Sequence, residues 1–172
     1  MLKRSPLPRT LQITIFRRDG WLCHLCKRPV IFAPVMRLLE REVMLAGCAH
    51  RLAYYNERWT REGAPLLDQL AAVIDHVEAH AKGGKDEESN LATACCKCNA
   101  QKNDTARDQY LVRSPKHRIK GKYGEPQHWD GLSTLFITLA RRDLGALTAT
   151  EKQWLSALTS QVMPDEKQSV LA

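Results

Sequence analysis

The sequence predicts an α+β fold built on a small ββα unit, with two zinc knuckles, a helical insertion and a C-terminal helical hairpin. Three observations support this prediction. Two Cys-x-x-Cys pairs stand far apart in the chain, Cys23 with Cys26 and Cys95 with Cys98. Two short strand-like stretches flank a glycine-rich turn and lead into a helical stretch. Apolar residues recur at helical spacing in the segments on either side.

The length bounds the domain organisation. The chain has 172 residues, of which 44% are hydrophobic, enough for one ordinary domain with appendages. We expect a core domain over residues 1–124 with an insertion at about 29–71, a helical hairpin over 125–163 and a flexible tail over 164–172. No apolar run approaches the roughly 20 residues that span a bilayer, and no apolar stretch follows the basic N-terminus. We therefore expect no membrane segment and a cytoplasmic protein.

The N-terminal region predicts one short helix followed by a metal-binding turn. Thr10 can cap a helix over residues 11–18, and an Asp-Gly turn then leads into the first cysteine pair. Cys23 and Cys26 have the spacing of a zinc knuckle. His24 lies between them, and we expect it to be exposed or to face nucleic acid rather than to bind the zinc.

The insertion predicts helices. Pro34 at a first-turn position and Gly47 just past the end delimit one helix of about 13 residues. A second helical stretch is expected over 48–59, and a third short one begins at Leu66.

The centre of the chain predicts the ββα unit. Residues 72–77 have the β-branched content of a strand, 82–89 form a turn, and 90–94 read as the returning strand. A helix is then expected from Lys97 to about Leu111.

Two further amphipathic helices are expected near the C-terminus. One begins near Trp129 and ends near Gly145, and the other follows a capping box, Thr148 to Glu151, and runs to about Val162. We expect this hairpin to pack on the core or on a partner.

The cysteines favour zinc over disulfides. Without an export signal the compartment is reducing, and two CxxC pairs match a four-cysteine zinc site. Such a site is closed and structural. Cys96 forms no CxxC pair, although an exchange of register with Cys95 stays open. The alternative is that these are unrelated buried thiols.

The basic charge is concentrated next to the cysteine pairs. The net charge is +7, and residues 1–28 contain seven basic residues against one acidic residue. Residues 97–123 contain eight basic residues against two acidic ones. A polyanion is the natural partner of such a distribution, and a solvated basic surface is the alternative.

Catalytic chemistry is suggested by polar residues between the cysteine pairs. The oxygens of Asp75 and Asn99 are hard ligands that suit Mg²⁺ or a similar ion. His76, neutral near pH 7, can accept a proton from an attacking water molecule.

These residues resemble the HNH family of nucleases, which have the ββα-metal fold. The resemblance covers residues 10–28 and 72–106. The last histidine of the family name is asparagine here, an HNN variant, and Ala79 stands where many relatives have proline. The matching residues are Asp19-Gly20-x-x-Cys23-x-x-Cys26, Asp75-His76, Gly83-Gly84, Asn90-Leu91 and Cys95-x-x-Cys98-Asn99-x-x-Lys102.

The resemblance implies roles for the site residues. Asp75 and Asn99 would bind the catalytic ion, which is Mg²⁺ or Mn²⁺, with Ni²⁺ and Co²⁺ as further options. His76 would be the general base, and Asn90 would brace the loop that orients it. The structural zinc would be bound by Cys23, Cys26, Cys95 and Cys98.

The predicted function is a metal-dependent DNA endonuclease of phage or bacterial type, serving restriction, defence, packaging or a mobile element. The alternative is a non-catalytic, zinc-stabilised nucleic-acid-binding module of a larger complex. Double-stranded DNA is the expected partner, and a second copy or an accessory protein could bind through 125–163. The residues expected to contact DNA are basic: Lys82, Lys97, Lys102, Arg107, Arg113, Lys116, Arg118, Lys120 and Lys122.

Overall fold

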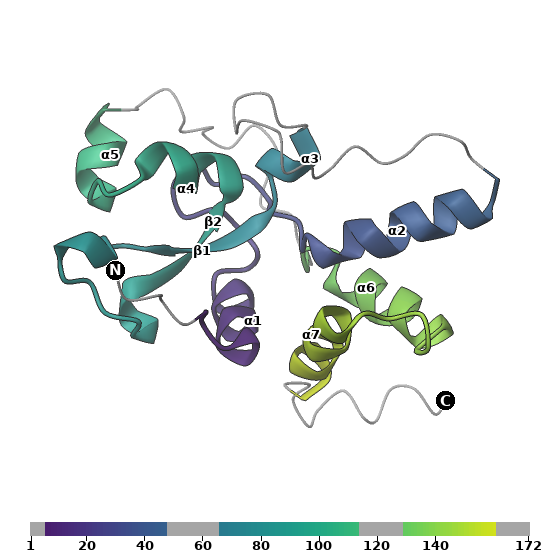
Figure 1. Cartoon of the computed structure of the whole chain (residues 1–172). Coiled ribbons are helices and arrows are strands. Elements are labelled where there is room, and N and C mark those ends of the chain that lie inside the picture. Colours follow the sequence, from purple (N-terminus) through teal and green to yellow (C-terminus); the bar gives the residue numbers. More distant parts are fainter. Residues whose placement is uncertain (1–5, 48–65, 114–128, 161–172) are drawn as a thin grey trace, which may run out of the picture.

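The ββα unit forms one side of the molecule, and the longer helices of the insertion and of the C-terminal region form the other side (Figure 1). The computed structural model describes residues 6–47, 66–113 and 129–160. Strands β1 (Ala72–His76) and β2 (Leu91–Cys95) pair antiparallel, with Ala72 opposite Cys95 and His76 opposite Leu91. Helix α4 (Cys96–Lys102) follows β2 directly (Figure 1). The predicted α+β class and the strand, strand, helix order are confirmed.

The connection between the strands is an open loop with two short 3₁₀ turns. These turns are η1 (His80–Lys82) and η2 (Glu88–Asn90). The loop begins where β1 ends at His76, so its residues lie beside the polar end of that strand.

Helix α1 (Arg9–Arg18) packs against β2 and against the last helix. It begins at Arg9, directly after Pro8, and no side chain caps it. The prediction that Thr10 is the cap was therefore wrong. Pro8 has φ −53°, close to the helical value, and has no N–H of its own to satisfy, so the chain enters the helix without a polar cap.

The helix predicted over 97–111 is two helices. Helix α4 ends at Lys102, and α5 (Arg107–Arg113) starts after a turn in which Asn103 has φ +46°. Asn103, Asp104 and Thr105 are poor helix formers, because their side chains compete for backbone hydrogen bonds. The backbone N–H of Arg107 instead donates to the Val77 carbonyl at 3.3 Å, which ties α5 to the end of β1.

The insertion leaves the core and returns to the same point. The Ile31 N–H donates to the Leu70 carbonyl at 3.0 Å, and the Ala72 N–H donates to the Ile31 carbonyl at 2.8 Å. Between them, α2 (Pro34–Leu45) starts at the predicted proline and ends before Gly47, whose φ is +79°. The short α3 (Leu66–Gln69) precedes β1. The helix expected over 48–59 lies outside the described residues.

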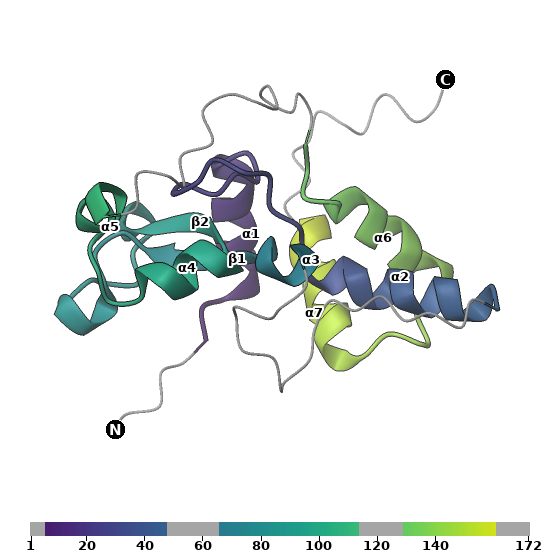
Figure 2. The ribbon, with the colours of Figure 1, turned by 90° about the horizontal axis from the view of Figure 1, so that it is seen from above.

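The C-terminal hairpin packs on helices of the same chain. Helix α6 (Ser133–Arg142) lies beside α2, and α7 (Ala149–Ser160) contacts α1 and α6 (Figures 1 and 2). The predicted capping box is confirmed: the Glu151 N–H donates to Thr148 Oγ1 at 3.2 Å, and the Thr148 N–H donates to Glu151 Oε2 at 2.8 Å. The expected boundary at residue 124 and the tail over 164–172 lie outside the described residues.

An aromatic cluster joins the hairpin to the segment of the first knuckle. The Phe32 ring lies 6.0 Å from Trp21, 5.1 Å from Phe136 and 5.2 Å from Trp154, measured between centroids and in edge contacts. Gly131 approaches so closely that a Cβ there would lie 2.2 Å from the Trp21 ring. The helices and the ββα unit thus share one hydrophobic core.

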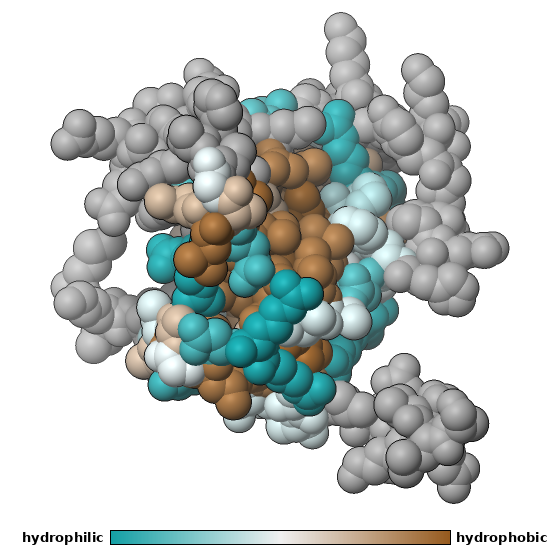
Figure 3. Space-filling model, turned by 90° about the vertical axis from the view of Figure 1, so that its right-hand side faces the viewer, coloured by the Kyte–Doolittle hydropathy of each residue, from teal (hydrophilic) through white to brown (hydrophobic). Residues whose placement is uncertain are grey.

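The surface formed by the outer ends of these helices is partly apolar. In the view of that side, hydrophobic residues gather in the middle of the face and polar residues surround them (Figure 3). Met44 and Leu45 at the end of α2 are 50% and 78% exposed, and Leu144 is 54% exposed. None of the helices in the described ranges is both long and apolar enough to cross a bilayer.

We expect the fold to lose stability in acid through Asp130, which caps α6. Burial alone raises the pKa of Asp130, but hydrogen bonds from Thr134, Leu132 and Ser133 outweigh burial and lower it. A lowered folded-state pKa means that this stabilisation is present above about pH 4, the unfolded value, and disappears as the pH falls through the folded value.

The measurement is urea unfolding of the parent and of Asp130→Asn between pH 7 and pH 3. We expect the difference between the two proteins to shrink as the pH falls. Asp108→Asn is the control, since that side chain is 92% exposed. A difference that stays constant over this range would contradict the assignment.

Candidate active site and metal centre

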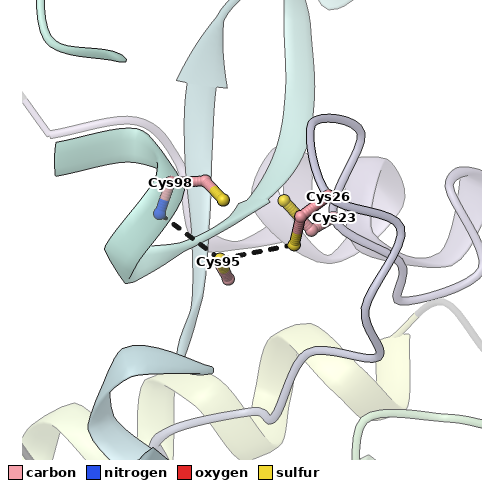
Figure 4. Close-up of side chains that lie close together, drawn as sticks. All are labelled: Cys23, Cys26, Cys95 and Cys98. Carbon is pink, nitrogen blue, oxygen red and sulfur yellow. Dashed lines mark hydrogen bonds between the residues drawn. The ribbon is translucent and has the colours of Figure 1, made fainter. Parts of the chain in front are cut away.

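The four predicted zinc ligands come together. The sulfur atoms of Cys23, Cys26, Cys95 and Cys98 all lie within 4.8 Å of one another and are buried (Figure 4). Cys26 Sγ and Cys95 Sγ are 3.9 Å apart. A tetrahedral zinc with bonds of about 2.3 Å separates its sulfur ligands by about 3.8 Å. The cluster therefore fits a zinc ion, and Cys96 is not part of it.

Local backbone structure sets the positions of these thiols. In the first knuckle the Cys23 N–H donates to the Arg28 carbonyl at 2.9 Å, and the Lys27 N–H donates to the Cys23 carbonyl at 2.8 Å. In the second, Cys95 ends β2 and its sulfur accepts from the Cys98 N–H at 3.4 Å, at the start of α4. The knuckles are thus a closed turn and a strand-to-helix junction.

The thiols change one another's pKa values. Hydrogen bonding from Cys26 and the other thiols lowers the pKa of Cys23. Hydrogen bonding to Cys23 raises the pKa values of Cys95 and Cys98. Hydrogen bonding to Cys23 alone would raise the pKa of Cys26, but hydrogen bonds from Cys95 and Cys98 outweigh it and lower this pKa as well. The cluster thus accepts its first negative charges readily and resists the later ones, because several buried charges of one sign repel. Four thiolates together require a dication, which is the charge that zinc supplies.

Asp75 lies buried at the end of β1, next to a buried lysine. Its Oδ1 accepts from Lys102 Nζ at 3.0 Å, and the same ammonium donates to the His76 carbonyl at 2.7 Å. Lys102 is 1% exposed. The prediction that Lys102 contacts DNA was therefore wrong. Its ammonium group is buried and bound to protein groups, where it offsets the negative charge of Asp75.

The other oxygen of Asp75 contacts the turn that carries the first cysteine pair. His24 Nε2 lies 2.8 Å from Asp75 Oδ2, and the His24 side chain is 12% exposed. The expectation that His24 is exposed was therefore wrong, and its position on the nucleic-acid side stays a prediction. The knuckle loop turns this ring inward because the His24 N–H donates to the Thr93 carbonyl of β2 at 2.8 Å.

His76 is paired with an aspartate of the loop. Its Nε2 lies 2.6 Å from Asp86 Oδ1, and the side chains are 10% and 38% exposed respectively. The ring of His80 stands 5.9 Å from the His76 ring in an edge contact. The carboxylate thus fixes the orientation of an almost buried imidazole.

Asn90 holds the loop that carries Asp86. Its Oδ1 accepts from the Glu78 N–H at 2.8 Å, and its Nδ2 donates to the carbonyls of Glu78 at 3.2 Å and Lys85 at 3.0 Å. Steric constraints explain why two glycines, Gly83 and Gly84, stand in this loop. Gly83 has φ +95°, and a Cβ on Gly84 would lie 2.0 Å from the Glu78 oxygen.

Asn99 lies on α4 and is half-buried. Within the described ranges, its carboxamide makes no hydrogen bond to another residue. A carboxamide whose oxygen is not engaged by the described residues suits a hard cation.

The basic residues expected to contact DNA are only partly described. Lys82 is exposed, and Lys97 and Arg107 are half-buried. The Arg107 Nε is buried without a hydrogen-bond partner among the described residues. Arg113 ends α5, and its side chain is not described. Lys116, Arg118, Lys120 and Lys122 lie outside the described ranges.

The contacts of two residues at this site are not predicted by the sequence. Asp86 was one of three consecutive acidic residues in a polar turn, and no spacing rule marks which of them reaches His76. For His24, the sequence predicts a position that is exposed or faces nucleic acid, and not the contact with Asp75. The signal that could have found it is its place between the two cysteines of a CxxC pair, which restricts where its ring can point.

Comparison with known families agrees with this geometry. Residues 63–105 match the family model described as HNH endonuclease, a range that contains the hairpin, its loop and α4. No curated protein and no solved structure gives a significant match. The chain thus contains an HNH endonuclease domain match over residues 63–105, and its four-cysteine cluster is consistent with a zinc-site variant of that domain.

Proposed function

We propose that this protein is a metal-dependent endonuclease that hydrolyses phosphodiester bonds in DNA, of phage or bacterial type. The observation that carries the proposal is the arrangement at the end of β1. A nearly buried imidazole, His76, is paired with a carboxylate at 2.6 Å, and the adjacent residue is the carboxylate of Asp75. General base and metal ligand are thus neighbours in one strand.

The catalytic ion would be bound by Asp75 and Asn99. Their oxygens are the donors that Mg²⁺ and Mn²⁺ prefer, and the carboxamide of Asn99 is not engaged by the described protein. When bound, a divalent ion neutralises charge on the phosphate and the leaving oxygen. Ni²⁺ and Co²⁺ are further options for such a site.

His76 would take the proton of the attacking water. Asp86 orients the ring and stabilises the positive charge that forms on it, as a carboxylate does for a catalytic histidine in general. Asn90 acts indirectly, because it holds the loop that brings Asp86 to His76.

DNA would be held by phosphate contacts. Lys82 is exposed on the loop, and Lys97 and Arg107 lie on α4 and α5. The basic stretch that follows Arg113 adds charge. Such contacts give affinity that falls steeply with salt but no sequence preference. A second copy or an accessory protein at 125–163 stays a prediction.

One observation favours a second candidate, a zinc-stabilised binding module without activity. Both oxygens of Asp75 are engaged by protein groups, Lys102 and His24, and the residue is 3% exposed. A carboxylate enclosed in this way stabilises the fold, and this role does not require catalytic activity.

Plasmid cleavage distinguishes the two functions. We expect the purified, zinc-loaded protein to nick or cut supercoiled DNA with Mg²⁺ or Mn²⁺, to stop with EDTA, and to resume when excess Mg²⁺ is added. Zinc content is measured after EDTA, so that loss of the structural ion is not mistaken for loss of the catalytic one. Single-stranded DNA and RNA are tested in parallel. DNA binding without metal-dependent cleavage would favour the binding module.

A further inference from the structure

We propose that His24 is a ligand of the divalent ion held by Asp75, so that the ion is bound by an imidazole nitrogen as well as by oxygens. The inference rests on the proposed function, because it concerns the ion of that site. It adds a residue from the first zinc knuckle, far in sequence from the strand and helix that supply the other ligands.

The distance between the two side chains has the right size. His24 Nε2 and Asp75 Oδ2 are 2.8 Å apart. Two ligands at adjacent positions of a six-coordinate ion with bonds of about 2.1 Å are about 3.0 Å apart. The same pair that shares a hydrogen bond can thus share an ion when the neutral ring carries its proton on Nδ1, which leaves the Nε2 lone pair to bind the ion.

Lys102 and His24 contact different oxygens of the Asp75 carboxylate. Lys102 Nζ binds Oδ1 at 3.0 Å and is itself anchored on the His76 carbonyl at 2.7 Å. Oδ1 is therefore occupied by a buried cation, and Oδ2 is the oxygen available to a second cation. The ion that binds Oδ2 meets the imidazole of His24.

The backbone that carries the His24 ring is fixed on both sides. Its neighbours Cys23 and, two residues on, Cys26 belong to the zinc cluster, and its own N–H is bonded to Thr93 of β2 at 2.8 Å. A ligand fixed in this way loses little conformational entropy when the ion binds. The structural zinc thereby also positions a donor for the second ion.

A nitrogen ligand has a consequence for metal preference. Imidazole suits Mn²⁺, Co²⁺ and Ni²⁺ better than Mg²⁺, which prefers oxygen donors. We expect the site to bind Mn²⁺ more tightly than Mg²⁺, and this preference to diminish when the ring of His24 is replaced.

The test uses Mn²⁺ on the full-length, zinc-loaded protein. Pulsed EPR of the Mn²⁺ complex is expected to show coupling to a ¹⁴N nucleus in the parent. His24→Gln is expected to lose this coupling and to bind Mn²⁺ about 10- to 100-fold more weakly. Glutamine can still hydrogen-bond to Asp75, so the change is not simply a lost contact. His76→Ala should keep the coupling, which excludes the neighbouring ring as its source.

The control for affinity is His80→Gln, which removes an exposed imidazole of the loop. It should bind Mn²⁺ like the parent, and all variants should contain zinc. Parent protein that binds Mn²⁺ and cuts DNA but shows no ¹⁴N coupling would overturn the role of His24 and leave the nuclease function intact. Coupling that survives in His24→Gln would do the same. Failure of the parent both to bind Mn²⁺ and to cut DNA would instead refute the proposed function.

Discussion

Replacing His76 with alanine is expected to lower the cleavage rate by about 10²- to 10⁴-fold, the usual contribution of a general base. The ring sits at the end of β1, almost buried and bonded to Asp86 at 2.6 Å. Without it, no side chain in that position takes the proton from water. We expect kcat to fall while Mn²⁺ affinity stays near that of the parent, because the metal ligands are retained.

The measurement is single-turnover cleavage of plasmid DNA at saturating metal. Zinc content and the thermal unfolding curve show whether the variant is folded. His76→Gln serves as a second variant of closer volume, in case alanine leaves a destabilising cavity. Either variant cleaving as fast as the parent, with its zinc present, would remove His76 from its assigned role.

The partner of His76 gives a graded version of the same experiment. Asp86→Asn should reduce kcat by about 10- to 100-fold, less than loss of the ring, because the amide no longer stabilises positive charge on the imidazole. KM should change little. Glu87→Gln is the matched control, since it removes the same charge from the next residue, which pairs instead with Lys85 at 3.5 Å.

Removal of the zinc is expected to unfold the core. A structural zinc contributes roughly 10–16 kcal/mol in small zinc domains, which equals or exceeds the ~5–15 kcal/mol net stability of an ordinary domain. Here the ion would join the first knuckle to the junction of β2 and α4. Without it four buried thiols remain at the centre of the hydrophobic core.

Metal analysis should find about one tightly bound zinc per chain in the parent and little in Cys95→Ser. The variant should lose the cooperative transition in circular dichroism. Cys96→Ser is the control next in sequence, and it should keep both zinc and transition because Cys96 is not part of the cluster. If Cys95→Ser retained its zinc and melted like the parent, the four-cysteine site would be wrong.

The sequence could predict the zinc site because its information is local. Each CxxC pair specifies a tight turn by itself, and pairing two such turns requires no knowledge of the rest of the chain. The strands and α4 are also local signals, read from β-branched stretches and a glycine-rich turn. The division into α4 and α5 was missed, since three poor helix formers are a weak signal within a helical stretch.

The burial of Lys102 and the partners of Lys102 and His24 could not be predicted from the sequence. Lysine is usually exposed, and Lys102 stands among other basic residues, so an exposed position was the natural expectation. Its burial depends on Asp75, 27 residues earlier in the chain, and on the His76 carbonyl. The same holds for His24, whose partner is 51 residues away.

The sequence by itself determined the ββα order, the four clustered cysteines, and the residue types of an HNH site. These are set by short-range spacing and by donor chemistry. Only the tertiary structure decided that Lys102 and His24 enclose Asp75, that Asp86 rather than its acidic neighbours reaches His76, and that α6 and α7 pack on α2 and α1. Those outcomes depend on which side chains become buried together, and burial is fixed by contacts between segments far apart in the chain.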